Sequence, residues 1–369
     1  MKRTYILLLV AFAVTNLKAQ NKVNLLVGTY TNSCDSKGIY VYEFDTNSGE
    51  SKLKNTSESS VSPSYLSVSA DNKFIYAVNE SGAESTVSAF GYVPASGKVT
   101  FLNKQKAMGA DPCYLINDGE NVITANYSGG NISVFKKTAE GISEAKQVIQ
   151  HTGKGVNPQR QEGAHVHMVY FSPDKKYVLS NDLGLDKVFI YNYNPTSKDK
   201  VLTLKGSVDV KAGSGPRHLT FSKDGKFVYL IQELDATLTT FGYDKDGSLK
   251  LIAETNILAK DFKGGTGAAA IKISPDGKFL YVSDRVDANN ISVYKILKNG
   301  KIELVEQVST LGKGPRDFSI DPTGKFLLVG HQYTNNIVVF KRDKVTGKLT
   351  DTGKRIELCA PVGLVFTKI

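Results

Sequence analysis

A hairpin that repeats along the chain is the feature that most constrains its fold. Residues 215–233, GPRHLTFSKDGKFVYLIQE, read as two short strands in which apolar side chains alternate with others on both sides of the turn KDGK. Related segments recur at a spacing of roughly 50 residues, which is within the range of propeller repeats. They are residues 63–80, 112–126, 164–182, 268–285 and 315–331.

Each hairpin is followed by a third β-rich run and then by a weaker fourth one. The third runs cover residues 86–92, 130–135, 187–193, 236–243, 290–294 and 335–340. Residues 249–254 and 302–308 are examples of the fourth. Four antiparallel strands per repeat, with little helical periodicity, are typical of a propeller blade.

The two ends of the chain complete one further blade. Residues 361–368 match only the first strand of a repeat, whereas residues 22–30 and 38–44 match a second and a third strand. A ring closed in this way leaves no exposed strand edge, and neither terminus resembles the polar cap that an open solenoid needs. The sequence therefore predicts an all-β, seven-bladed propeller, with residues 20–369 forming a single domain.

The first 19 residues have the composition of a secretory signal peptide. Lys2 and Arg3 precede an apolar run at residues 6–14, and Leu-Lys-Ala at residues 17–19 provides a small-residue cleavage site. The apolar run is too short to cross a bilayer of roughly 30 Å as a helix. We expect cleavage and export, to the periplasm, with no membrane span afterwards; an uncleaved chain would be cytoplasmic.

Charge and cysteine content exclude several classes of protein. The formal net charge is +10, but the lysines are spread over turns rather than clustered, so no nucleic-acid partner is expected. Three cysteines without metal-ligand spacing do not describe a disulfide scaffold. A Cys34–Cys359 pair is left open, because both residues should lie near the joint blade; the oligomeric state is also left open.

Polar residues gather where the first strand of a blade begins and its second strand ends. These two positions share one face of the ring and converge on the mouth of the central channel, whereas the hairpin turns lie on the opposite face. Such residues could simply satisfy backbone groups at strand ends, but several Arg, His and acidic residues at equivalent positions favour a site. They are Glu80, Asn126, Asp182, Glu233, Arg285 and His331 at the ends, and His165, His167, Arg217, His218, Arg316 and Asp317 at the starts.

These residue types suit the opening of a lactone. The reaction needs a base to activate water, cations to stabilise a tetrahedral oxyanion and an acid for the leaving alkoxide. His165 and Glu233 are candidates for proton transfer, and Arg217 and Arg285 for binding the oxyanion or an acidic group of the substrate. No Gly-x-Ser-x-Gly motif is present, so water is the expected attacking group.

A metal site is not expected. In His165-Val166-His167 the two imidazoles fall on one side of a strand and could begin a metal site. However, the sequence assures no third ligand.

Several motifs resemble those of the seven-bladed lactonase family, which includes propeller-type bacterial 6-phosphogluconolactonases and fungal carboxymuconate-lactonising enzymes. The resemblance covers nearly all of the chain after residue 19. It is most specific in NPQRQEGAHVH (residues 157–167), DLGLD (182–186), GPRH (215–218) and PRDF (315–318), with VGTYT (27–31) and NYSGG (126–130) in support.

The resemblance implies a catalytic set and no metal or organic cofactor. Carried over by motif from the fungal branch, the catalytic residues are His165, Arg217, Glu233 and Arg285. The candidates for substrate binding are Arg160, Gln161, His167 and Asp182 from the family motifs, together with Glu80, His218, Arg316 and His331 from the strand positions. Whether His165 or Glu233 is the base stays open.

The expected function is hydrolysis of a sugar lactone, as in a 6-phosphogluconolactonase of carbohydrate metabolism. Export would favour an unphosphorylated lactone, because 6-phosphogluconolactone is made in the cytoplasm. Two alternatives remain: lactonising or cycloisomerase chemistry on an unsaturated dicarboxylate, and a propeller that binds without catalysis. The absence of Trp from the sequence weakens a sugar-binding interpretation based on aromatic stacking.

Overall fold

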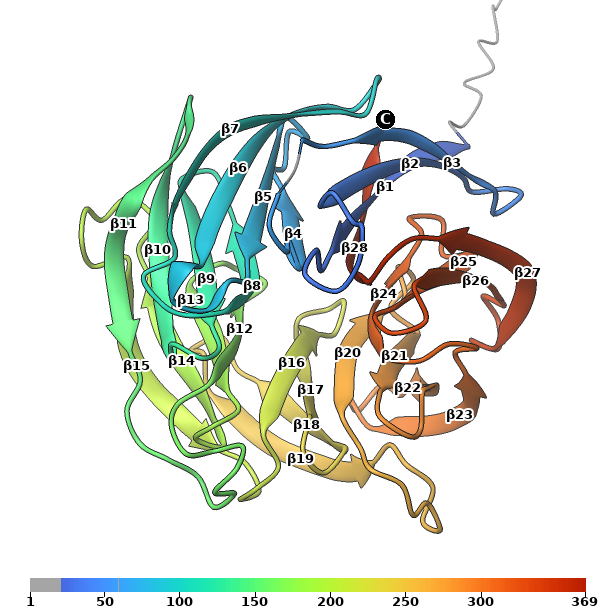
Figure 1. The fold of residues 1–369 in the computed structure, drawn as a ribbon. Coiled ribbons are helices and arrows are strands. Elements are labelled where there is room, and N and C mark those ends of the chain that lie inside the picture. Colours follow the sequence, from blue (N-terminus) through green and yellow to red (C-terminus); the bar gives the residue numbers. More distant parts are fainter. Residues whose placement is uncertain (1–20, 59) are drawn as a thin grey trace, which may run out of the picture.

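The computed structural model describes residues 21–58 and 60–369. In this part of the chain, strands form seven four-stranded antiparallel sheets that are arranged as blades around a central axis (Figure 1). The all-β, seven-bladed propeller is therefore confirmed. The expected signal peptide, residues 1–19, lies outside the described residues.

One blade joins the two ends of the chain. It consists, from the inside outward, of β28 (Pro361–Lys368), β1 (Lys22–Thr29), β2 (Ile39–Asp45) and β3 (Ser51–Thr56). Strand β28 pairs with β1 in an antiparallel register that runs from Val23 opposite Lys368 to Gly28 opposite Gly363. Figure 1 shows the red C-terminal strand lying beside the blue N-terminal one.

The other blades follow in chain order, each with its first strand innermost. The next three are β4 (Tyr65–Val68), β5 (Phe74–Asn79), β6 (Thr86–Val93) and β7 (Lys98–Lys106); β8 (Pro112–Asn117), β9 (Asn121–Asn126), β10 (Asn131–Thr138) and β11 (Gly141–Gln150); and β12 (Val166–Phe171), β13 (Tyr177–Asp182), β14 (Lys187–Tyr193) and β15 (Leu202–Asp209). A short 3-10 helix, η1 (Gly82–Glu84), follows β5.

The last three complete blades are built in the same way. They are β16 (Pro216–Phe221), β17 (Phe227–Gln232), β18 (Thr237–Tyr243) and β19 (Leu249–Asn256); β20 (Ala268–Ile273), β21 (Phe279–Asp284), β22 (Asn290–Ile296) and β23 (Ile302–Ser309); and β24 (Pro315–Ile320), β25 (Phe326–His331), β26 (Asn336–Arg342) and β27 (Leu349–Glu357).

The turns of the repeated hairpins have a common local cause. Between β16 and β17, the Ser222 hydroxyl donates to Asp224, and the Phe227 amide donates back to Ser222 at 3.0 Å. Gly225 takes a positive φ of 72°, which a residue without a β-carbon adopts at little cost. An equivalent hydrogen bond from a serine hydroxyl to an aspartate two residues later occurs in the turns that begin at Ser69, Ser172 and Ser274. The polar turn sequence therefore fixes these four hairpins.

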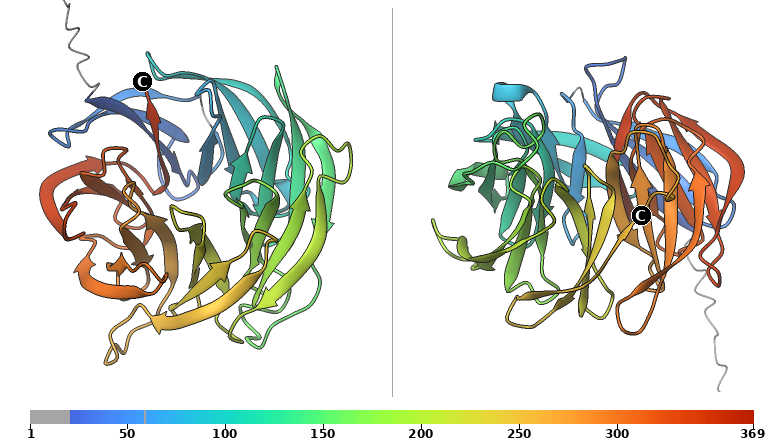
Figure 2. Two further views of the ribbon diagram at one scale, coloured as in Figure 1. Left: turned by 180° about the vertical axis from the view of Figure 1, so that it is seen from behind. Right: turned by 90° about the horizontal axis from the view of Figure 1, so that it is seen from below.

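Apolar layers between neighbouring blades hold the ring together. Strand side chains alternate in direction, so each sheet presents apolar residues to the sheets on either side. Among the largest side chains that are fully buried are Tyr76, Tyr191, Tyr229 and Phe340. The two further views in Figure 2 show the blades stacked side by side around the axis.

A disulfide between Cys34 and Cys359 ties the ends of the chain together in the joint blade. Their Cα atoms are 6.1 Å apart, within the usual range for a disulfide. The sequence left this pair open, and the structure forms it. Cys113 is a buried free cysteine. Among the described residues, no helix is both long and apolar enough to span a bilayer.

Candidate active site

Irregularities in the innermost strands direct side chains toward the centre of the ring. In β8, β12, β16 and β24 the pairing register shifts by one residue near the start of the strand. The extra residue of such a bulge is unpaired, and its side chain is turned away from the regular alternation. These extra residues are Cys113, His167, Arg217 and Arg316.

The second strand of each blade contributes a further central residue immediately after it ends. Strands β1, β5, β9, β17 and β21 end at Thr29, Asn79, Asn126, Gln232 and Asp284, all of which are buried. Successive side chains alternate in direction, so the next residue points the other way. Those next residues are Tyr30, Glu80, Tyr127, Glu233 and Arg285.

Both sets meet around one cavity, which we call the arginine cavity. Its volume is about 300 Å³, enough for a small ligand. All seven blades, or the loops that lead into them, contribute to its wall. The lining residues are Tyr30, Glu80, Asp111, Cys113, Tyr127, Ser128, Arg160, His167, Glu233, Arg285 and Arg316.

Glu233 holds three guanidinium groups on one side of the arginine cavity. Its Oε2 accepts from Arg217 Nε at 2.8 Å and lies 3.0 Å from Arg285 Nη2. Its Oε1 accepts from Arg160 Nη2 at 2.7 Å. Three charge-assisted contacts to one carboxylate fix these side chains relative to one another.

The arginines differ in their access to a ligand. Arg217 lies behind Glu233, is 1% exposed and donates through Nη1 to the carbonyl oxygen of Ala269. Arg285 Nε donates to the Gly267 carbonyl at 2.9 Å and Nη2 contacts Glu233, and within the described residues Nη1 has no hydrogen-bond partner. Arg160 has a side chain that is 43% exposed. Arg217 therefore positions Glu233, whereas Arg285 retains free N–H donors on the cavity side.

The charges determine how Glu233 titrates. Burial alone would raise the pKa of Glu233, but Arg285, Arg217 and Arg160 outweigh burial and hold this pKa well below its usual range. Burial and the neighbouring Arg285 lower the pKa of Arg217 to about 9, against the opposing effect of Glu233. Glu233 is consequently a fixed anion and a weak base.

The other side of the arginine cavity contains a second carboxylate in different surroundings. Glu80 accepts from the Tyr30 hydroxyl, at 3.0 Å to Oε1 and 3.2 Å to Oε2, and also from the Ser64 hydroxyl. The Arg316 guanidinium lies 5.4 Å from the centre of the Tyr30 ring. The donors that fix Glu80 are therefore neutral hydroxyl groups.

His167 and Cys113 also line the arginine cavity. His167 Nδ1 is 3.6 Å from Cys113 Sγ, and His167 Nε2 is 4.0 Å from Glu233 Oε2. Burial and the cations Arg217 and Arg316 hold the pKa of His167 well below its usual value. Burial, and then Glu80, raise the pKa of Cys113, so its thiol stays protonated and is a poor nucleophile.

Three of the predicted site residues hold the cavity wall in place from outside. The ring of His165 stacks on Tyr127 at 4.6 Å, and its Nε2 contacts Glu162 at 3.1 Å. Gln161 donates to the Leu183 carbonyl at 2.9 Å, which fixes the loop carrying Arg160. Asp182 accepts from the His165 amide and contacts buried His151. None of the three lines the arginine cavity.

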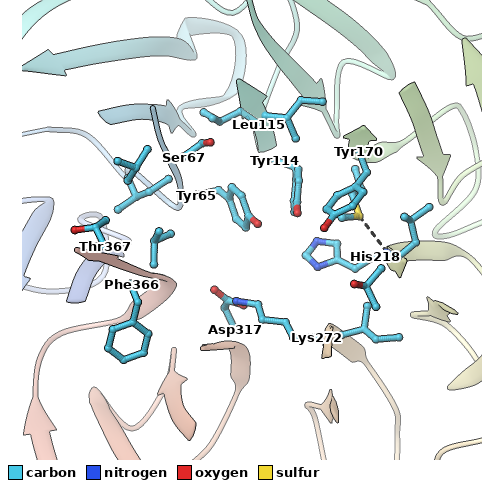
Figure 3. A pocket seen from close by; sticks show the side chains of 18 of the residues that line it. Tyr65, Ser67, Tyr114, Leu115, Tyr170, His218, Lys272, Asp317, Phe366 and Thr367 are labelled. Carbon is cyan, nitrogen blue, oxygen red and sulfur yellow. Dashed lines mark hydrogen bonds and ion pairs between the residues drawn. The ribbon is translucent and has the colours of Figure 1, made fainter. Parts of the chain in front are cut away.

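His218 and His331 lie elsewhere as well. His331 ends β25 and is enclosed within its blade, where burial lowers its pKa to about 4. His218 lines a second cavity, of about 590 Å³, which we call the tyrosine cavity (Figure 3). Besides His218, the side chains that characterise the tyrosine cavity are Tyr65, Tyr114, Tyr170, Lys272 and Asp317.

The residues predicted from the strand ends occupy two successive positions, whose side chains point in opposite directions. Glu80, Glu233 and Arg285 lie one residue beyond their strands and line the arginine cavity, whereas Asp182 and His331 are the last residues of theirs and point into the blade. Keeping the phase constant would have found Tyr30 and Tyr127, which the sequence analysis missed. Cys113 was missed because nothing in the sequence marks a bulge.

The described residues contain no group of three or more His, Cys, Asp or Glu side chains arranged to hold a metal ion. His165 and His167, which could have begun such a site, both pack on Tyr127 but have different polar neighbours: Glu162 for the first, Cys113 and Glu233 for the second.

Comparison with known proteins places the chain in a family. Residues 24–366 match the model of the lactonase family with a seven-bladed β-propeller, which is nearly the whole of the described chain. The chain belongs to this lactonase family. A 6-phosphogluconolactonase of Bacillus subtilis (strain 168) is 36% identical over 349 residues, covering 92% of this chain and 97% of the relative.

Solved structures of the family have the same fold. A candidate 6-phosphogluconolactonase from Bacteroides fragilis NCTC 9343 is 44% identical, with a TM-score of 0.90 over 95% of this chain and 99% of that one. A periplasmic gluconolactonase from Pseudomonas aeruginosa is 33% identical, with a TM-score of 0.89 over 94% of this chain and 99% of that one. The lactonase family thus includes a periplasmic member.

Proposed function

We propose that this lactonase hydrolyses a sugar lactone in the arginine cavity, at the mouth of the central channel. The observation that carries the proposal is the fixed position of Arg285, whose guanidinium is held by Glu233 at 3.0 Å and by the Gly267 carbonyl while free N–H donors remain. Preorganised donors of this kind stabilise the oxyanion that forms when water attacks a carbonyl.

The proposed roles differ in part from those implied by the family resemblance. Arg285 binds the oxyanion and Arg316 an acidic or hydroxyl group of the substrate, since both line the arginine cavity. Arg217 and Glu233 position Arg285 and Arg160. His165 supports Tyr127 rather than taking a proton from water. Names of relatives favour glucono-1,5-lactone and 6-phosphogluconolactone as substrates.

The test is proton release by purified protein, residues 20–369, on glucono-1,5-lactone and 6-phosphogluconolactone in a pH-stat. We expect opening well above the spontaneous rate on at least one lactone, without any conjugated chromophore. A chromophore from an unsaturated acid would indicate the lactonising alternative. Spontaneous rates with both lactones would overturn the proposed function and favour a binding propeller.

We also propose that the protein is exported. The Cys34–Cys359 disulfide supports this, because structural disulfides persist in oxidising compartments; so do the expected signal peptide and the periplasmic relative. The test is fractionation of cells expressing residues 1–369, with a thiol count on the denatured protein. We expect it in the periplasmic fraction with one reactive thiol before reduction and three after it. Three reactive thiols in a cytoplasmic fraction would contradict export.

A further inference from the structure

The arginine cavity contains two glutamates whose partners are of opposite kinds. Glu233 is contacted by Arg160, Arg217 and Arg285 through both of its oxygens. Glu80, on another blade, is contacted by the hydroxyls of Tyr30 and Ser64. Pairs of carboxylates in contrasting surroundings commonly divide the roles of a reaction between them. The question is which group of this cavity takes a proton from water.

Four other candidates for the base are unsuitable. Glu233 is a weak base because three arginines stabilise its charged form. Protonation of His167 is opposed by its burial and by Arg217 and Arg316. The Cys113 thiol stays protonated in its buried position. His165 does not line the arginine cavity; its ring contacts Glu162 and stacks on Tyr127.

Glu80 has the position that a general base for water requires. Its carboxylate lines the arginine cavity and is only partly buried, so it can contact bound water. Tyr30 and Ser64 orient the carboxylate without adding a positive charge of their own. The Arg316 guanidinium lies over the Tyr30 ring, 5.4 Å from its centre, and the charge of Glu80 helps to stabilise it. Glu80 is thus an anchored carboxylate facing the space in which a lactone would bind.

We propose that Glu80 is the general base, and then the general acid, of lactone opening; the inference rests on the proposed function. Glu80 removes a proton from water as the water oxygen bonds to the lactone carbonyl carbon, and Arg285 stabilises the resulting oxyanion. The tetrahedral intermediate then breaks its bond to the ring oxygen. Glu80 returns the proton to this oxygen, giving the open hydroxy acid, which loses its carboxyl proton to solvent.

The first test compares Glu80→Gln with wild type and with Glu84→Gln. The substitution at Glu80 keeps size and hydrogen-bonding capacity but removes the base, so we expect kcat to fall by about 10² or more while KM changes less than about 3-fold. Glu84 is an exposed carboxylate in η1, and its variant should behave as wild type.

The second test uses chemical rescue, which a purely structural role would not show. In Glu80→Ala the cavity gains room for a small carboxylate, and we expect added formate to restore part of the lost kcat in a saturable manner, with no effect on wild type. Unchanged kcat in Glu80→Gln would overturn the inference while wild-type lactone opening upholds the proposed function. Loss of kcat in Glu80→Gln without rescue of Glu80→Ala would also overturn the assignment of a base.

Discussion

The arginine cavity and the tyrosine cavity differ in charge chemistry although neighbouring residues of the same strands line them. Arg316 lines the first and Asp317 the second; Cys113 and Tyr114 divide in the same way. In the tyrosine cavity, Lys272 and Asp317 form a single ion pair at 2.8 Å. In the arginine cavity, Glu233 is shared by three arginines. The bulges thus direct neighbouring residues of one strand into different cavities.

The tyrosine cavity is rich in groups that stay neutral. Burial raises the pKa of Tyr65, Tyr114 and Tyr170. Burial and Arg217 hold the pKa of His218 well below its usual value. Figure 3 shows the three tyrosine hydroxyls turned toward the centre of the cavity near His218. The fixed cations, which are effective in stabilising a developing oxyanion, are concentrated in the arginine cavity.

The largest effect is expected from Glu233→Gln. Removing this charge leaves buried Arg217 without its anion and releases Arg285 and Arg160 from their positions. We expect kcat/KM for lactone opening to fall by about 10² or more. The free energy of unfolding should fall by about 3–5 kcal/mol, as for other broken buried ion pairs. Measurements are pH-stat rates and urea unfolding; wild-type values of both would contradict the role of Glu233.

A smaller effect is expected from Arg316→Ala. Arg316 lines the arginine cavity, but its guanidinium lies against the Tyr30 ring and is not among the contacts of Glu233. We expect KM to rise by about 10-fold with a smaller change in kcat, as for a lost substrate contact. Steady-state rates over a range of lactone concentrations measure this. A fall in kcat at constant KM would instead assign Arg316 to the oxyanion.

Asp284→Asn tests whether the buried carboxylate of Asp284, next to Arg285 in the sequence, destabilises the folded protein when it is ionised. In the described residues Asp284 Oδ1 has no hydrogen-bond partner, and burial raises the pKa of this carboxyl to about 6. The folded state therefore binds the proton more tightly than the unfolded state, so wild-type stability falls as pH rises from about 4 to about 6. We expect the variant to be more stable by about 3 kcal/mol at pH 7.

The pH dependence provides the control for Asp284→Asn. Below about pH 4, the carboxyl is protonated in both states, so the stabilising effect of the substitution should vanish. Urea unfolding at pH 7 and at the lowest pH where the protein stays folded measures the difference. A stabilisation that is the same at both pH values would contradict the pKa assignment.

The smallest effect on activity is expected from Asp317→Asn. Asp317 pairs with Lys272 and accepts from the Leu364 amide, so the substitution acts in the tyrosine cavity. We expect kcat/KM to stay within about 3-fold of wild type. A loss as large as that of Glu233→Gln would show that the two cavities act together, and would remove the functional distinction between them.

Most of the fold could be predicted because it follows from local pattern and repetition. Alternating apolar residues define the strands, serine, aspartate and glycine define the turns, and residues 361–368 match the strand that the first blade lacks. The partial predictability of the site has a physical reason. Arg217 and His218 are neighbours in sequence, but a bulge directs Arg217 to Glu233 and His218 into the tyrosine cavity.

The roles of the site residues depend on contacts across blades, which no local pattern encodes. His165 carries the family motif, but stacking on Tyr127 and contact with Glu162 take it out of the arginine cavity. The sequence makes Glu233 a candidate base, but in the structure Arg160 from a neighbouring loop and Arg285 from a neighbouring blade contact its carboxylate. The disulfide likewise depends on closure of the ring, which brings the Cα atoms of Cys34 and Cys359 to 6.1 Å from each other.

The most direct test of the central claim is the rate of lactone opening by Arg285→Ala. The matched control is Arg355→Ala, which removes an arginine of the outer strand β27 that pairs with Asp351. On the lactone that wild type opens fastest, we predict that Arg285→Ala stays folded, as judged by circular dichroism, but loses about 10² or more in kcat, while the control retains wild-type kcat. Wild-type kcat in a folded Arg285→Ala protein would contradict lactone hydrolysis in the arginine cavity.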